Sequence, residues 1–111
     1  MIKNFIFILF IIYIMEKSNL VSLNKLKSVA KIKGLDKYYK EIGYSTAKGK
    51  KYYVKTIDGK KVNFGSILYQ DFLIHKNKER QNRFLKRFNK LYMKHQNEYN
   101  KPIFWAVRLL W

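Results

Sequence analysis

The sequence predicts a small α+β domain in which a β-hairpin and helices share one core. Residues 50–66 contain two runs rich in aromatic and β-branched side chains, separated by Asp58-Gly59. Residues 77–99 carry apolar side chains at the spacing of one helical face. A short C-terminal segment after Pro102 holds both tryptophans and is predicted to be helical. A hairpin alone is marginal in water, so one of the other two segments must cover its apolar face.

Composition and charge limit the size of this domain and the class of its partner. The chain has 111 residues, enough for one small core, and its apolar content of 48% is too high for a disordered tail. It has 24 basic and 7 acidic residues, which give a net charge of +17. It has no cysteine, which excludes disulfides and thiolate metal ligands. The charge favours a polyanionic partner.

Residues 1–15 form an apolar leader, with an unbroken apolar run over residues 5–15. This run is shorter than the ~20 residues that a membrane-spanning helix needs. Three interpretations stay open. Translation starts at Met15 and the leader is a mis-assigned start, or the leader is a short segment that inserts into an anionic membrane, or it is a core strand or helix.

Residues 16–42 are predicted to be a helical N-terminal segment. Ser18 or Asn19 can cap a helix that runs to about Lys33, and Gly34 ends it. The residues that follow are rich in Gly, Ser, Thr and Lys, which is typical of a loop. We therefore expect a polar linker at 43–50 and a small basic α+β domain at 50–111.

The hairpin prediction depends on Asp58-Gly59. This dipeptide suits a two-residue turn of the primed type, in which both central residues have positive φ. The alternation of a strand then assigns side chains to two faces. One face carries Tyr52, Val54 and Thr56, and the other carries Tyr53, Lys55 and Ile57.

The predicted helix at 77–99 has an apolar stripe centred on Phe88 and one cationic flank. At ~100° per residue, Phe84, Leu91 and Tyr92 fall on the stripe, and the flank opposite the cations is nearly uncharged. A stripe of one sign repels itself, and contact with phosphates would relieve that repulsion. The alternative is a solvated lysine-rich surface with no partner. The candidate nucleic-acid contacts are Arg80, Arg83, Lys86, Arg87, Lys90 and Lys94, with Lys50, Lys51, Lys60 and Lys61 as an auxiliary patch.

The sequence carries no pattern that predicts catalysis. His75 and His95 are the only histidines, and the seven acidic residues are scattered without metal-ligand spacing. Asp71 and His75 could form an acid–base pair, although a local hydrogen bond between them is the simpler interpretation. We therefore predict a protein that is not an enzyme, with no metal and no cofactor.

Two resemblances bear on function. Residues 22–40 resemble the first helix and turn of SAP-like and Rho-N-terminal-like modules, which bind nucleic acid, with matches at Gly34, Leu35 and Tyr38 but no second helix. The motifs Lys-Lys-Tyr-Tyr-Val-Lys and Gly-Lys-Lys-Val-Asn-Phe-Gly, with the tryptophan-rich tail, resemble a family of small, basic, uncharacterised domains. That family is found mainly in large double-stranded DNA viruses. The second resemblance covers Lys50 to Trp111 and implies a viral origin without an established activity.

These features together predict a non-catalytic protein that binds DNA or RNA through phosphates, largely without sequence specificity. The alternative is a minor virion structural protein that contacts acidic virion proteins or lipid, with residues 1–15 as its tether to an anionic membrane. Either protein would act in the host-cell cytoplasm or nucleus, or in the virion.

Overall fold

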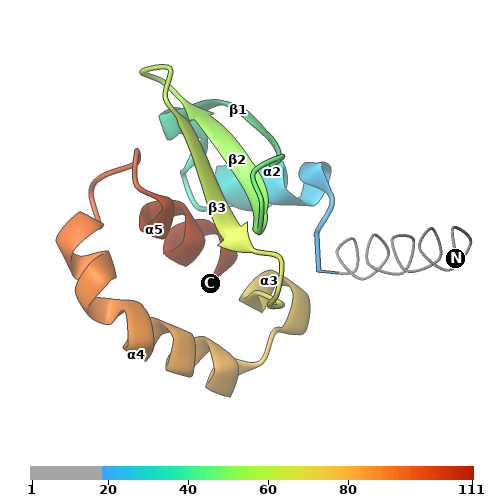
Figure 1. Cartoon of the computed structure of the whole chain (residues 1–111), viewed down its shortest axis with the longest axis vertical. Helices are drawn as coiled ribbons and strands as arrows, with labels where there is room; N and C mark the ends of the chain where they lie inside the picture. The colour runs from blue at the N-terminus through green and yellow to red at the C-terminus, as the bar shows by residue number, and fades with distance from the viewer. Residues whose placement is uncertain (1–18) are drawn as a thin grey trace, which may run out of the picture.

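The computed structural model describes residues 19–111, in which one face of a three-stranded antiparallel sheet packs against helices (Figure 1). The predicted α+β class is confirmed. The interpretations of the leader, residues 1–15, lie outside the described residues. The elements in chain order are α2 (Leu23–Ile32), the 3₁₀ turn η1 (Asp36–Tyr38), β1 (Tyr39–Tyr44), β2 (Lys50–Thr56), β3 (Lys61–Ser66), α3 (Phe72–His75), α4 (Lys78–His95), α5 (Pro102–Trp105) and the π-helical turn η2 (Ala106–Leu110).

Helix α2 starts later than predicted. Its N-cap is Ser22, whose hydroxyl oxygen accepts the backbone N–H of Lys25 at 3.1 Å, so the caps expected at Ser18 or Asn19 are wrong. The helix ends one residue before Lys33, and Gly34 follows with φ of 71°, as a terminating glycine does. Both the start and the stop are therefore fixed by local backbone chemistry.

The predicted linker at 43–50 is wrong, because β1 already includes Gly43 and Tyr44. Strand β1 pairs with β2, with Ile42 opposite Val54, and a tight connection at 45–49 joins the two strands. The side chain of Ile42 is buried in the same core as residues of α2. The predicted N-terminal segment and the predicted domain therefore share one sheet and one core.

The turn between β2 and β3 is longer than the predicted two-residue turn. Residues 57–60 form the connection, and the carbonyl of Thr56 accepts the N–H of Gly59 at 2.9 Å. Within residues 57–60 only Gly59 has a positive φ, of 89°, so the expectation of positive φ at both Asp58 and Gly59 is wrong. The hydroxyl of Thr56 also donates a hydrogen bond to the carboxylate of Asp58. This local bond holds the turn, although Asp58 does not adopt the left-handed conformation.

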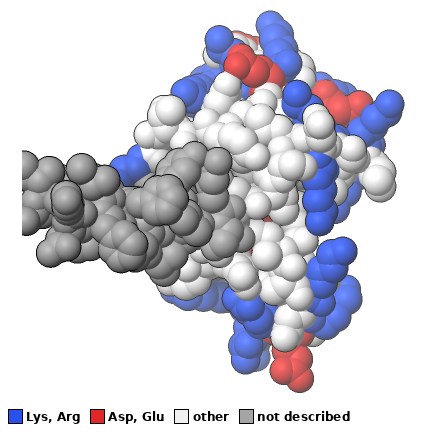
Figure 2. Space-filling view, turned by 90° about the vertical axis from the view of Figure 1, so that its right-hand side faces the viewer, with Lys and Arg blue, Asp and Glu red and all other residues white. Residues whose placement is uncertain are grey.

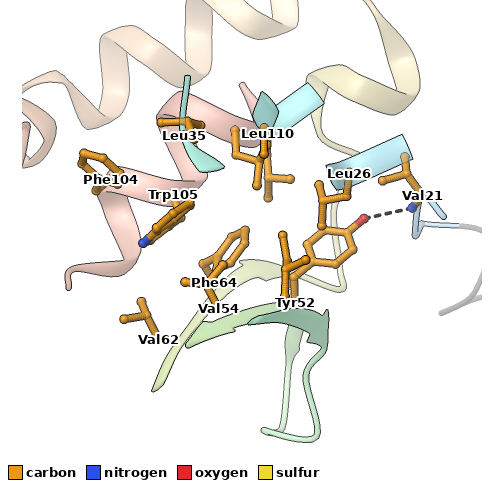
Figure 3. Packing of buried hydrophobic residues seen from close by; sticks show 13 residues of the cluster. Val21, Leu26, Leu35, Tyr52, Val54, Val62, Phe64, Phe104, Trp105 and Leu110 are labelled. Carbon is orange, nitrogen blue, oxygen red and sulfur yellow. Dashed lines mark hydrogen bonds between the residues drawn. The ribbon is translucent and has the colours of Figure 1, made fainter. Parts of the chain in front are cut away.

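The predicted faces of β2 are confirmed. Tyr52, Val54 and Thr56 are buried against the helices, whereas Lys55 and Ile57 are exposed on the other side. The hydroxyl oxygen of Tyr52 accepts the N–H of Val21 at 2.9 Å, which ties the start of the described chain to the core (Figure 3). Burial raises the pKa of Tyr52, so its hydroxyl stays protonated.

Trp105 is the centre of the core. Its side chain is fully buried and lies over the sheet beside Phe64, with ring centroids 6.0 Å apart (Figure 3). The ring of Phe104 meets it edge-on at 5.2 Å, and its indole N–H donates to the carbonyl of Tyr99 at 2.6 Å. The C-terminal segment therefore covers the apolar face of the sheet, one of the two arrangements that the sequence allowed.

Helix α4 does not join this core. None of residues 78–95 is buried, and Figure 1 shows the helix standing away from the sheet. Its main link to the C-terminal segment is Trp111. The ring of Trp111 stacks on that of Phe84, with centroids 4.1 Å apart and ring planes 4° apart. The carbonyl of Trp111 also accepts a side-chain N–H of Gln81 at 2.6 Å. The apolar stripe of α4 is thus only half covered.

We expect Trp105→Ala to lower the free energy of unfolding by ~3–5 kcal/mol, because it empties the centre of a small core. Chemical denaturation followed by circular dichroism measures this change. The matched control is Ile32→Ala, at an 85% exposed position of α2, which should change stability by no more than ~0.5 kcal/mol. Equal effects of the two substitutions would contradict the central role of Trp105.

Candidate nucleic-acid interface

A cleft of about 690 Å³ separates α4 from the rest of the domain, a volume typical of ligand sites. Helix α4 forms one wall, with Arg80, Arg83, Phe84, Arg87, Phe88 and Leu91. The opposite wall comes from β2, β3 and the loop before α3, with Lys50, Lys51, Gly65, Ser66, Tyr69, Gln70 and Asp71. The C-terminal segment contributes Pro102, Ile103, Ala106, Leu110 and Trp111.

The helical repeat of α4 places a row of arginines beside a row of aromatic rings. Positions 80, 83 and 87 are three and four residues apart, so their side chains project from one side of the helix. Phe84 and Phe88 form the adjacent row, with ring centroids 4.7 Å apart. The guanidinium of Arg87 lies 5.3 Å from the centroid of Phe88, within the range of a cation–π contact. The cationic and aromatic rows therefore meet on the cleft side of α4.

The six cations predicted on α4 separate into two groups of three. Arg80, Arg83 and Arg87 line the cleft. The other three, Lys86, Lys90 and Lys94, are exposed and lie outside its lining. The chain has only four arginines, so three of them line this cleft while the lysines of α4 face solvent. Arginine presents a planar fork of donors that suits phosphate and also stacks on rings.

The auxiliary patch is not one surface. Lys50 is exposed and lines the cleft opposite the arginines. Lys60 and Lys61 lie at the β2–β3 turn, at the end of the sheet away from α4 (Figure 1). The ammonium of Lys61 is 4.5 Å from the ring centroid of Tyr53, on the outer face of the sheet. These two lysines therefore cannot act together with the arginines on one short ligand.

Lys51 was predicted as a phosphate contact, and this prediction is wrong. Its side chain is buried, with 2% of the residue exposed, and its ammonium lies 3.0 Å from the carboxylate of Asp71. Burial lowers the pKa of Lys51 and raises the pKa of Asp71, and each partner's charge opposes the shift of the other. The two residues form an internal ion pair that joins β2 to the start of α3.

Asp71 and His75 are joined by a local hydrogen bond, as the simpler interpretation of the sequence expects, but through their backbones: the N–H of His75 donates to the carbonyl of Asp71 at 3.1 Å. The Nδ1 of His75 accepts the backbone N–H of Asn77 at 2.8 Å, and its ring lies 5.1 Å from that of Trp111. Burial lowers the pKa of His75, and so does the nearby charge of Arg80, while Asp71 opposes them. Residues 19–111 contain no group of three or more side chains arranged to hold a metal ion.

Four aromatic side chains of the cleft were not predicted from the sequence as contact residues. Phe84 and Phe88 were placed on the apolar stripe of the helix, Trp111 was placed in the C-terminal segment, and Tyr69 was given no role. All four residues line the cleft. The available signal was the spacing of three of the chain's four arginines around Phe84, since an otherwise lysine-rich chain places arginine almost nowhere else.

Comparison with known proteins gives one match. Residues 40–88 match a family described as a family of unknown function, DUF5754. The match extends from β1 into α4 and includes Lys50 and the three arginines of the cleft. The resemblance to an uncharacterised family, expected over Lys50 to Trp111, is confirmed where the two ranges overlap, at residues 50–88. No curated protein and no solved structure matches the chain.

Within residues 19–111, no helix has both the length and the apolar character needed to cross a membrane.

We expect the buried pair to show strong coupling in a double-mutant cycle. Lys51→Met and Asp71→Leu should each lower the free energy of unfolding by ~3–5 kcal/mol, because each leaves one buried charge without its partner. The double variant should lose far less than the two single losses combined. Additive losses, measured by urea denaturation, would show that the two charges do not depend on each other.

Proposed function

We propose that this protein binds nucleic acid without catalysing a reaction and that the cleft beside α4 is the contact surface. One observation carries the proposal. Arg80, Arg83 and Arg87, three of the chain's four arginines, line a cleft that also exposes aromatic rings. Guanidinium groups bind phosphates through paired hydrogen bonds, and aromatic rings can contact bases.

The balance of charge in the cleft supports an anionic ligand. Within the described part of the chain, Asp71 is the only acidic residue that lines it, and Lys51 neutralises that carboxylate. The three arginines and Lys50 then remain as positive charges without an opposing acid in the lining. A phosphate backbone would supply that opposing charge.

The remaining charge supports a general attraction to polyanions. Figure 2 shows lysine and arginine side chains at the top, the bottom and the right edge of one face, around a largely uncharged middle. These groups are too scattered to form one site, but they contribute to the net charge of +17. Such a charge raises the encounter rate with nucleic acid at low ionic strength. Contacts to phosphates carry no sequence information, so we propose weak sequence specificity.

The resemblance over Lys50 to Trp111 adds a proposed setting. We propose that the protein acts during infection by a large double-stranded DNA virus, in the host cell or in the virion. The alternative role, a structural protein that contacts acidic protein or lipid, would use the same cations and is tested by the same experiment.

The test compares two charge-matched triple variants of α4. Arg80→Gln with Arg83→Gln and Arg87→Gln should weaken binding to a labelled single strand by at least about 30-fold at low salt. It should also make the slope of log K against log[salt] shallower by ~2, because about three phosphate contacts are lost. Fluorescence anisotropy at several salt concentrations measures both quantities.

The control removes the three exposed lysines of the same helix. Lys86→Gln, Lys90→Gln and Lys94→Gln together should weaken binding by less than about threefold, because these side chains lie outside the cleft. Equal losses in the two variants would contradict the cleft as the contact surface. Failure of the full chain to bind duplex DNA, single-stranded DNA or RNA would contradict the function itself, and tighter binding to anionic vesicles would favour the structural alternative.

A further inference from the structure

We infer that the cleft holds a single strand, with its phosphates on the arginine row of α4 and its unpaired bases against the aromatic row. This inference rests on the proposed function and names the ligand class of the same site. It also predicts that duplex is the poorer ligand.

The apolar face of α4 is incompletely covered. An amphipathic helix normally buries its apolar stripe against a core. Here Phe84 and Phe88 are only half-buried, and Leu91, one turn further along the same wall, is 47% exposed. The cleft is therefore open along an apolar wall that a ligand could cover.

Aromatic rings from three parts of the chain line the cleft. Trp111 stacks face to face on Phe84, with ring planes 4° apart, so the aromatic lining of the cleft includes rings from both α4 and the C-terminal segment. Tyr69, which is 62% exposed, lines the cleft from the opposite wall. Base–aromatic stacking is tolerant of sequence because every base has a π-face. This aromatic lining thus suits bases more specifically than it suits an acyl chain.

Charged side chains and aromatic rings form two adjacent rows along α4. The arginines lie at 80, 83 and 87, beside the rings at 84 and 88. A single strand has phosphates on one side and freely turning bases on the other, so it can satisfy both rows at once. In a duplex the base faces are covered by neighbouring base pairs, so they cannot stack on the aromatic row, and only phosphates and base edges remain accessible to the protein.

The test uses the full chain and three ligands of about twelve units, a length within the range bound by single-strand modules. They are an oligothymidylate, the same sugar–phosphate chain without bases, and a duplex. At one salt concentration the oligothymidylate should bind at least about tenfold more tightly than either other ligand. It should also quench tryptophan emission, and Trp111→Phe should abolish the quench, because Trp105 is fully buried.

Variants of α4 assign the base-dependent part of binding. Phe88→Leu keeps the apolar volume but removes the ring. It should reduce the ratio of the affinity for the oligothymidylate to the affinity for the chain without bases by about fivefold, and leave the affinity for the chain without bases unchanged. Phe88→Tyr keeps a ring and should leave this ratio unchanged. The control is Tyr92→Leu, one turn further along α4 and outside the cleft lining, which should have no effect.

The outcomes separate this inference from the proposed function. Equal affinities for the oligothymidylate and the abasic chain, with both lost in the triple arginine variant, would overturn the inference and leave the function in place. A preference for duplex or for anionic vesicles would overturn the inference too, as would equal effects of Phe88→Leu and Tyr92→Leu. If none of the nucleic acids binds, both proposals fall.

Discussion

The structure depends on how the single apolar face of the sheet is covered. A three-stranded sheet of this size offers little inner surface, and Trp105 occupies its middle. Helix α2 covers the part near β1, and α5 with η2 covers the part near β3. These elements bury the inner-face side chains Tyr52, Val54 and Phe64, and α4 packs against the C-terminal segment instead. The helix is therefore left at the side, and the cleft is a consequence of the small sheet.

Much of the fold could be predicted from local pattern. The alternation around Val54 identifies the inner face of β2, and the period around Phe88 identifies α4, because both patterns repeat over many residues. Strand β1 was missed because Ile42 is its one buried large apolar side chain, a signal too short for periodicity. Strand β1 is therefore defined by its hydrogen bonds to β2 more than by its own side chains.

The candidate site could be predicted only in part. Periodicity shows that Phe84 and Phe88 share an apolar face, but it does not show what covers that face. The error at Lys51 has a similar cause, since its partner, Asp71, is twenty residues further along the chain. A lysine next to exposed Lys50 in a basic stretch gives no local sign of burial. Both errors concern tertiary partners, which a single sequence does not contain.

The loose attachment of α4 has a consequence for its dynamics. Phe84, Gln81 and the region around Gln96 hold the helix to the C-terminal segment, whereas β2 is hydrogen-bonded on both edges. Local opening of α4 should then require much less free energy than opening of the sheet. Its backbone amides should exchange with solvent deuterium well before those of β2. Part of the binding free energy of any ligand in the cleft would go into ordering this helix. Ligands that bind more tightly should therefore also protect the amides of α4 more strongly from exchange.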